Sequence, residues 1–377
     1  MKYHHIERLR VRLDIVSPVH IGSSSQERLS KKECIIDNNK GRVYVPDVPR
    51  LLQVFENRGC LPQYEEFLME PSLPGNKSRS LEQFMRSMNI PVTGKEDWIQ
   101  YSLVVSTRDI GAVNVLNRCV KNSQGNPYIP GSSIKGALRT ALLAARMSEQ
   151  AVRALVDSAK FDPKNRRPGN EENALRVLGF PGNKPADAVN DLLRSLQVSD
   201  SAPFDGLSMT VCKKLELTQK GKINGMVQGF SGGKSAPPLY RECIMPGRST
   251  RFYMTLDKTL SGSRLTFQNI EDALKEWNRI QREYMDQFDL SQICHDENTN
   301  GGIPLTLGGG VGFQSKSLIY RAKDPELVRK TVHAVLKKQF ERTYLPYEDE
   351  AAPYRMKIAV NAGKYYPMGQ CRLTVEE

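Results

Sequence analysis

The segment YIPGSSIKGALRTALLAA, residues 128–145, most limits what this chain can fold into, because a Pro-Gly-Ser-Ser turn opens directly onto a long helical pattern. Apolar residues recur at the spacing of one buried helical face, at Ile134, Ala137, Leu138, Ala141, Leu142 and Ala145. Lys135 and Arg139 fall on an adjacent face, and Ser132 or Ser133 is placed to cap the helix. A helix N-terminus with cations nearby predicts an anion site, above all for phosphate. The alternative is an ordinary capped core helix with a solvated basic flank.

A second constraint is the segment LGGGVGFQSKSLI, residues 307–319, in which Gly308, Gly309, Gly310 and Gly312 crowd together ahead of Lys316. Glycine costs conformational entropy on folding, so this cluster indicates a backbone that must pass close to something. The alternative is a glycine-rich turn between two strands. A dinucleotide-binding fingerprint fails because position 313 is phenylalanine, and no segment satisfies the phosphate-binding P-loop pattern. Nucleotide hydrolysis is therefore not expected.

The charge of the chain favours a polyanionic partner. Its 377 residues carry a formal net charge of +12, with a pI near 9.3, which fits nucleic acid or a membrane surface. The chain has no apolar run long enough to cross a membrane and no secretory signal, so no membrane contact is expected. Its seven cysteines are odd in number and include no C-x-x-C pair, which predicts a reduced, cytoplasmic protein without structural zinc. No other metal and no cofactor are expected.

Strand and helix patterns both occur in each half of the chain. Apolar and polar residues alternate over positions 8–15, which predicts a half-buried first strand whose polar outer face carries Arg8, Arg10 and Arg12. Three further helices are expected: residues 185–198, residues 270–288, and one that begins at Pro325 with Asp324 as its cap. Strand patterns return after about residue 200 and close the chain. This mixture predicts an α+β fold.

The domain organisation follows from length and from one weakly patterned stretch. The chain is longer than most single domains, so two modules of similar size, residues 1–200 and 201–377, are expected. Residues 50–127 show weak periodicity and several prolines, which indicates an insertion in the first module. The glycine-rich segment belongs to the second module.

Four segments, in this order, resemble the RAMP superfamily of CRISPR-associated proteins: SPVHIG near the start, the Pro-Gly-Ser-Ser turn with its helix, VSDSAPF at residues 198–204, and LGGGVGFQSKSLI. The resemblance implies an α+β fold of two ferredoxin-like, RRM-related modules with helical and loop insertions. Within the superfamily, the length, the insertion and the ending YYPMGQCRLTV resemble the terminal backbone subunit of type III-A effector complexes. That subunit caps the end bearing the 3′ part of the guide RNA.

The resemblance implies a non-catalytic RNA-binding subunit that contributes to guide RNA maturation. Its expected partners are guide RNA, single-stranded target RNA, neighbouring backbone subunits and a host nuclease that trims the guide. Slicing relatives carry an aspartate after the first strand for metal-dependent cleavage, where this chain has Ser30, Lys31 or Lys32. The positions expected to contact RNA are His20, Arg28, Lys31, Gly131, Ser132, Ser133, Lys135, Arg139, Gly308, Gly309, Gly310, Gly312 and Lys316.

Two other functions stay open. His20 lies near Arg28 and two lysines, so it is a candidate general acid or base for metal-independent cleavage of repeat RNA. The alternative for His20 is a partly buried histidine that is bonded to the backbone or contacts RNA without chemistry. The third hypothesis is a sibling backbone subunit, either the target-slicing type, with Asp37 the nearest aspartate downstream, or one from the related type III-B complex.

Overall fold

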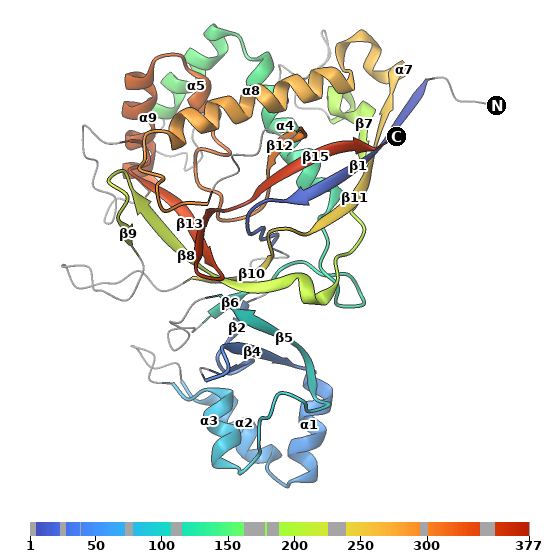
Figure 1. The fold of residues 1–377 in the computed structure, drawn as a ribbon, viewed down its shortest axis with the longest axis vertical. Coiled ribbons are helices and arrows are strands. Elements are labelled where there is room, and N and C mark those ends of the chain that lie inside the picture. Colours follow the sequence, from blue (N-terminus) through green and yellow to red (C-terminus); the bar gives the residue numbers. More distant parts are fainter. Residues whose placement is uncertain are drawn as a thin grey trace.

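The computed structural model of the protein describes residues 5–22, 28–37, 39–71, 78–106, 115–161, 178, 188–224, 239–294, 301–339 and 351–376. Helices and strands are mixed along the chain, which confirms the expected mixture of α and β structure. Within these ranges the strands form two sheets, one of five strands and one of ten (Figure 1). None of the helices in the described part of the chain has the length and apolar content that crossing a membrane requires.

The five-stranded sheet joins the two ends of the chain. Its neighbouring strands are antiparallel and follow the order β12 (Ile303–Thr306), β15 (Gln370–Glu376), β1 (Ile6–Ile15), β11 (Ser249–Asp257) and β7 (Leu196–Val198). The alternation predicted for the first strand is confirmed, because Val11 and Leu13 are buried while Arg10 and Arg12 are exposed. One face of this sheet therefore belongs to the core and the other is polar.

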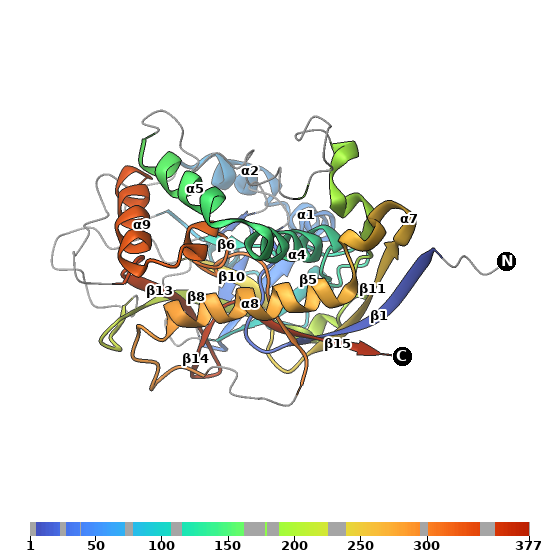
Figure 2. The same ribbon diagram turned by 90° about the horizontal axis from the view of Figure 1, so that it is seen from above.

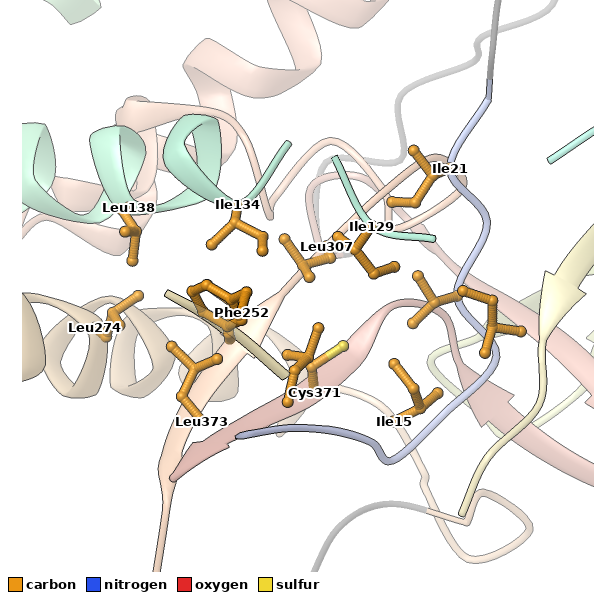
Figure 3. Packing of buried hydrophobic residues seen from close by; sticks show 14 of the residues in the cluster. Ile15, Ile21, Ile129, Ile134, Leu138, Phe252, Leu274, Leu307, Cys371 and Leu373 are labelled. Atoms are coloured by element: carbon orange, nitrogen blue, oxygen red, sulfur yellow. The ribbon is translucent and has the colours of Figure 1, made fainter. Parts of the chain in front are cut away.

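Helices α4 (Gly131–Arg146) and α8 (Phe267–Met285) cover the apolar face of this sheet and run side by side (Figure 2). Ile134 and Leu138 of α4 and Leu274 of α8 meet Phe252 and Leu373 of the sheet in the main hydrophobic core (Figure 3). Burying the apolar stripe of each helix against the strands is the main stabilising contact of this layer.

The five-stranded sheet and its helices run through nearly the whole sequence. In chain order, β1, α4, β7, β11, α8 and β15 alternate as β-α-β-β-α-β, and β12 is added at the edge beyond β15. Strand β1 pairs with both β11 and β15. The boundary predicted at residue 200 therefore does not separate the sheets, because strands from both sides of it alternate in this one.

The ten-stranded sheet also takes strands from both halves of the chain. Its main path is β2-β6-β10-β8-β5-β4-β3, while β9 and β13 pair with β8 and β14 pairs with β13. These strands are β2 (Arg28–Ser30), β3 (Ile35–Asp37), β4 (Arg42–Pro46), β5 (Ile99–Val105), β6 (Val115–Asn117), β8 (Met209–Thr218), β9 (Ile223–Asn224), β10 (Tyr240–Ile244), β13 (Arg355–Asn361) and β14 (Lys364–Pro367).

Helices α1 (Val48–Asn57), α2 (Leu61–Met69) and α3 (Leu81–Ser87) form a helical lobe (Figure 1). Its hydrophobic cluster also includes Ile35 of β3 and Tyr44 of β4. At its centre Phe84 stacks on Phe67 with ring centroids 5.0 Å apart and meets Phe55 edge-on at 5.5 Å. The insertion predicted over residues 50–127 therefore covers two different structures. The helices form the lobe, whereas β5 and β6 are strands of the ten-stranded sheet.

Among the described residues, the remaining α-helices are α5 (Glu149–Phe161), α7 (Lys258–Ser261) and α9 (Pro325–Gln339). The start of α9 is confirmed, because the Asp324 carboxylate accepts the amide N–H groups of Glu326 and Leu327 at 3.0 and 3.1 Å. The helix predicted over residues 185–198 was wrong: its described part contains two short 3₁₀ helices, Ala188–Asn190 and Leu192–Ser195, followed by β7. Pairing with β11 holds the backbone of β7 extended, and this tertiary contact overrides the helical pattern.

Candidate functional site

A pocket of about 440 Å³ lies where segments remote in the sequence meet. Its wall is formed by Ile21 and Gly22 of the loop after β1, the first turns of α4, the middle of α8, β12 and the glycine-rich segment. Its polar and glycine lining includes Gly22, Ser132, Ser133, Gly136, Thr140, Asn278, Gln281, Thr306, Gly308, Gly309, Ser315 and Lys316. The structure thus brings together five of the positions predicted to contact RNA: Ser132, Ser133, Gly308, Gly309 and Lys316.

The N-terminus of α4 is closed differently from the prediction. The helix begins at Gly131, so Ser132 and Ser133 lie inside its first turn and neither side chain caps it. The Asp200 carboxylate instead accepts the Gly131 amide N–H at 2.7 Å. The predicted serine cap was wrong, because the segment that follows β7 returns to this helix end and supplies the acceptor.

The two predicted cations of α4 bind the protein itself. The Lys135 ammonium donates to the carbonyl oxygen of Leu196 at 2.7 Å, and burial lowers the pKa of this lysine. Arg139 forms an ion pair with Asp191 at 2.5 Å. Neither side chain is among the described residues that line the pocket. Their contact with RNA stays a prediction.

The glycine-rich segment packs its backbone against the loop after β1. The Gly309 amide N–H donates to the carbonyl oxygen of His20 at 2.8 Å, and a Cβ atom added at Gly308 would lie 2.3 Å from that oxygen. Gly308, Gly310 and Gly312 have φ angles of 88°, 86° and 95°, a region that favours glycine. The expectation that this backbone passes close to something is confirmed, and at Gly308 the neighbour is the chain itself.

Lys316 brings a positive charge to the pocket. Its side chain is exposed, while protein packed around the ammonium group displaces water and lowers its pKa. Within the described ranges, the structure gives this ammonium group no hydrogen-bond or ion-pair partner. Unlike Lys135 and Arg139, it is therefore available to an anionic ligand.

His20 is buried, with 6% of its surface exposed. Its Nδ1 lies 2.8 Å from the backbone carbonyl oxygen of Glu242, and Nδ1 carries the hydrogen because a carbonyl oxygen only accepts. Burial lowers the pKa of the imidazole, and the hydrogen bond offsets part of this effect. This geometry matches the alternative of a buried, backbone-bonded histidine and gives a substrate little access to the ring.

The basic residues after the first strand lie outside the pocket lining that the structure describes. Arg28 is exposed at the start of β2, and the backbone carbonyl of Lys31 accepts the Leu81 amide N–H at 2.8 Å. Lys32 donates to the carbonyl oxygens of Phe67 and Glu70 at 2.8 and 2.7 Å, so its charge sits at the C-terminal end of α2. RNA contacts by Arg28 and Lys31 stay predictions.

The sequence predicts no metal site, and Asp37 is the aspartate nearest to these basic residues in the direction of the C-terminus. The Asp37 carboxylate accepts the amide N–H groups of Asn39 and Lys40 at 3.0 and 2.9 Å, which shapes the turn between β3 and β4. In the ranges that the structure covers, no three His, Cys, Asp or Glu side chains gather in a way that could hold a metal ion. Metal-free function stays a prediction.

Sequence reasoning missed the wall of the pocket that α8 supplies. Trp277, Asn278 and Gln281 line this wall, and Gln281 Oε1 accepts the hydroxyl hydrogen of Thr306 at 3.0 Å. From the sequence, Trp277 is predicted only to lie on the apolar face of the helix over residues 270–288. The sequence signal was Gln281, a polar residue four positions after Trp277 and therefore near the same face of the helix. The structure buries it at 8% exposure, and a buried polar side chain needs a hydrogen-bond partner.

The model of the RAMP superfamily matches residues 12–295 of the chain. This match covers the end of β1, all of α4, β7, β11 and α8, and the parts of the pocket wall that come from the loop after β1, α4 and α8. The chain therefore belongs to the RAMP superfamily, and the resemblance predicted from its motifs is confirmed.

More specific similarity is to proteins called CRISPR system Cms protein Csm5. The protein of that name from Streptococcus thermophilus is 27% identical over 381 residues, which cover 96% of this chain and 95% of the relative. Its counterpart from Enterococcus italicus is 25% identical, with 97% of this chain and 96% of the relative covered. A Mycobacterium tuberculosis protein of the same name is 24% identical, with 98% of both chains covered.

Two solved structures share the fold. A chain from the cryo-EM structure of a Csm–crRNA–target RNA ternary complex of a type III-A CRISPR-Cas system aligns with a TM-score of 0.67 at 19% identity, covering 98% of this chain and 100% of that one. The crystal structure of T. onnurineus Csm5 aligns with a TM-score of 0.60 at 18% identity, covering 96% and 99%. The architecture described above is thus shared over nearly the whole chain.

Proposed function

We propose that this chain is a non-catalytic RNA-binding subunit of a type III-A CRISPR effector complex in the cytoplasm. It caps the backbone of the complex at the 3′ part of the guide RNA and contributes to guide maturation. Its partners are guide RNA, single-stranded target RNA, neighbouring backbone subunits and a host nuclease that trims the guide. For the fold, we propose two ferredoxin-like modules, of which β1, α4, β7, β11, α8 and β15 make up one.

The observation that carries the proposal is the convergence of Ser132, Ser133, Gly308, Gly309 and Lys316 on one pocket. Hydroxyls, a close-packed backbone and an ammonium group with no ion-pair partner among the described residues suit the phosphates and ribose hydroxyls of single-stranded RNA. The formal net charge of +12 favours the same ligand class. Similarity to Csm5 over nearly the whole chain supports the choice of complex and subunit.

Binding and cleavage are tested together with end-labelled single-stranded RNA that carries a repeat-derived 3′ segment. The purified chain is incubated with this RNA in EDTA or in magnesium, and native and denaturing gels are run side by side. We expect a shifted but intact RNA in both conditions. Discrete products would overturn the non-catalytic assignment: EDTA-resistant products would point to His20 chemistry, and EDTA-sensitive products to a slicing subunit.

The pocket is tested with Lys316→Ala, and Lys323→Ala serves as the control. Both variants lose one exposed lysine, but Lys323 pairs with Glu149 and is not among the described residues that line the pocket. We expect Lys316→Ala to weaken RNA binding about fivefold and to lower the slope of log K against log salt by about 0.7, the contribution of one phosphate contact. Equal effects from both variants would refute the pocket as the RNA site. Lys135 and Arg139 are unsuitable here, since changing either breaks a contact within the protein.

A further inference from the structure

The face of the five-stranded sheet opposite α4 and α8 is polar and rich in arginine. We call it the open face. Residues paired across antiparallel strands share a face, so the register of β1 with β11 and β15 defines which side chains the open face presents. Alternate residues of β1 and their partners put six notable side chains on this open face: Arg8, Arg10, Arg12, Arg251, Tyr253 and Arg372. The side chains between them in sequence, such as Val11 and Phe252, are buried under the helices.

Positive charge is in excess on the open face. The same register puts three carboxylates there, Asp14, Glu376 and Asp257, against five arginines. Asp257 is held as the cap of α7, where it accepts the amide N–H groups of Thr259 and Leu260. The arginines are only partly neutralised, so the open face has a surplus of guanidinium groups for an anionic ligand.

The ion pairs on the open face leave its arginines accessible. Arg12 pairs with Asp14 at 2.8 Å, and Glu376 is shared by Arg251 at 2.8 Å and Arg10 at 3.3 Å. About half of each of these arginine side chains is still exposed: 48% for Arg10, 47% for Arg12 and 51% for Arg251. Exposed pairs of this kind are weak, so a phosphate can compete for the guanidinium groups.

An aromatic ring stands among these arginines. Tyr253 is 39% exposed, and the Arg8 guanidinium lies 3.9 Å from the centre of its ring. Bases of single-stranded RNA stack on exposed rings and on arginine planes, including rings on the sheets of RNA-binding modules. Tyr253 and Arg8 therefore form a stacking platform inside a basic surface.

We propose that the open face is a second surface for single-stranded RNA, on which the arginines hold the backbone and Tyr253 stacks a base. The choice of ligand rests on the proposed function, but the surface is separate: none of its six side chains is among the described residues that line the pocket. Arg8, Arg10 and Arg12 occupy every second position of β1, so they form a row with a spacing of about 7 Å. A row of cations suits a linear polyanion, and the exposed ring favours RNA over an acidic protein segment.

The ring is tested with the full chain and a fluorescent oligouridylate, which forms no secondary structure. Tyr253→Leu keeps an apolar side chain in the strand but removes the stacking plane, and we expect affinity to fall about fivefold or more. Tyr253→Phe keeps the ring and should bind like the wild type. Thermal unfolding of both variants checks that the sheet is intact. If Tyr253→Leu and Tyr253→Phe bind equally well, the stacking role is refuted.

The arginines are tested with Arg10→Ala combined with Arg12→Ala. We expect the slope of log K against log salt to fall by about 1.4, since two phosphate contacts are lost. Arg58→Ala combined with Arg86→Ala is the matched control, because it removes the same charge from exposed positions of the helical lobe. An equal fall in the control would mean that net charge alone sets the affinity, and the open face would then be no specific surface.

The outcomes separate this inference from the proposed function. If the wild type binds no single-stranded RNA, the proposed function fails and the inference with it. If the wild type binds and Lys316→Ala weakens binding while the open-face variants do not, only the inference fails. Polyglutamate provides the remaining comparison. If it binds the wild type as tightly as RNA, if Arg10→Ala with Arg12→Ala weakens both, and if Tyr253→Leu changes neither affinity, the open face is a surface for acidic protein, and the RNA assignment is overturned.

Discussion

Two glycines of α4 have opposite roles in packing. At Gly131 an added Cβ atom would lie 2.2 Å from the carbonyl oxygen of Val198, so the end of β7 reaches the helix only because this position has no side chain. At Gly136 no described atom lies within 4 Å of such a Cβ. The first glycine is required by packing, and the second leaves the helix end open toward the pocket.

Alanine at these two positions should therefore change stability in opposite directions. We expect Gly131→Ala to lower the free energy of unfolding by about 1–3 kcal/mol, as overpacking against a backbone does. Gly136→Ala should raise it by about 0.5–1 kcal/mol, because alanine is the better helix former. Urea unfolding followed by circular dichroism measures both. A Gly131→Ala variant as stable as the wild type would contradict the close approach of β7.

His20 makes stability depend on pH. Burial holds the pKa of its imidazole below the ordinary value of 6.5, so the unfolded chain binds the proton more tightly than the folded chain. The stabilisation from neutral His20 is present above about pH 6.5 and is lost as the pH falls below it. In His20→Asn the amide can still donate to the Glu242 carbonyl but does not titrate.

We expect the free energy of unfolding of the wild type to fall between about pH 7.5 and about pH 5.5, and to fall less steeply in His20→Asn. Denaturant unfolding at both pH values measures the two slopes. Since other groups titrate in both proteins, the difference between the slopes isolates His20. Identical slopes would mean that the folded state does not disfavour the imidazolium.

At the scale of elements, the helical lobe has clear start signals in the sequence. Asp47 caps α1 by accepting the Arg50 amide N–H at 3.2 Å, and Ser80 forms a capping box with Gln83 at the start of α3. Pro62, one of the prolines that suggested an irregular insertion, stands in the first turn of α2, as Pro49 does in α1, and proline is favoured there. Short helices show weak periodicity because each spans only two or three turns, so the caps were the better guide.

The lobe shares its aromatic cluster with Ile35 of β3 and Tyr44 of β4. The unit made of the lobe and this edge of the ten-stranded sheet is predicted to unfold separately from α4. We expect Phe84→Ala to destabilise it by about 3–5 kcal/mol, because Phe84 contacts Phe55 and Phe67. Hydrogen exchange should rise over α1 to α3 and stay unchanged in α4. Met69→Ala is the control, since Met69 is 85% exposed. Faster exchange in α4 would show that lobe and sheets form one cooperative unit.

At the scale of the molecule, the first and last strands of the chain close the five-stranded sheet. Ile15 pairs with Cys371 and Arg10 with Glu376, so the two ends of the sequence lie side by side. The other edge of β1 pairs with β11, from the second half of the chain. Neither residues 1–200 nor residues 201–377 hold a complete sheet, although two modules of these lengths were expected.

Fragments 1–200 and 201–377 should therefore fail to fold when each is expressed alone. The first would keep β1 and β7 without the strand between them, and the second would keep β11 and β15 without β1. Co-expressed, they should associate into one soluble particle that binds RNA. Size-exclusion chromatography and thermal unfolding measure both cases. Cooperative unfolding of either fragment alone would restore the two-module division.

The sequence by itself determined many of the local elements. The apolar face of α4, the alternating first strand and the cap of α9 each depend on residues close together in the chain, where periodicity and capping chemistry act. The motifs were also sufficient to identify the RAMP superfamily.

Only the tertiary structure decided which of these elements meet. It turned Lys135 toward Leu196, placed Asp200 on the N-terminus of α4, brought Gln281 into the pocket and put Tyr253 among the arginines of β1. Each of these contacts depends on the order and register of strands far apart in sequence. A local pattern carries no information about that order, because the same alternation fits any neighbour in a sheet.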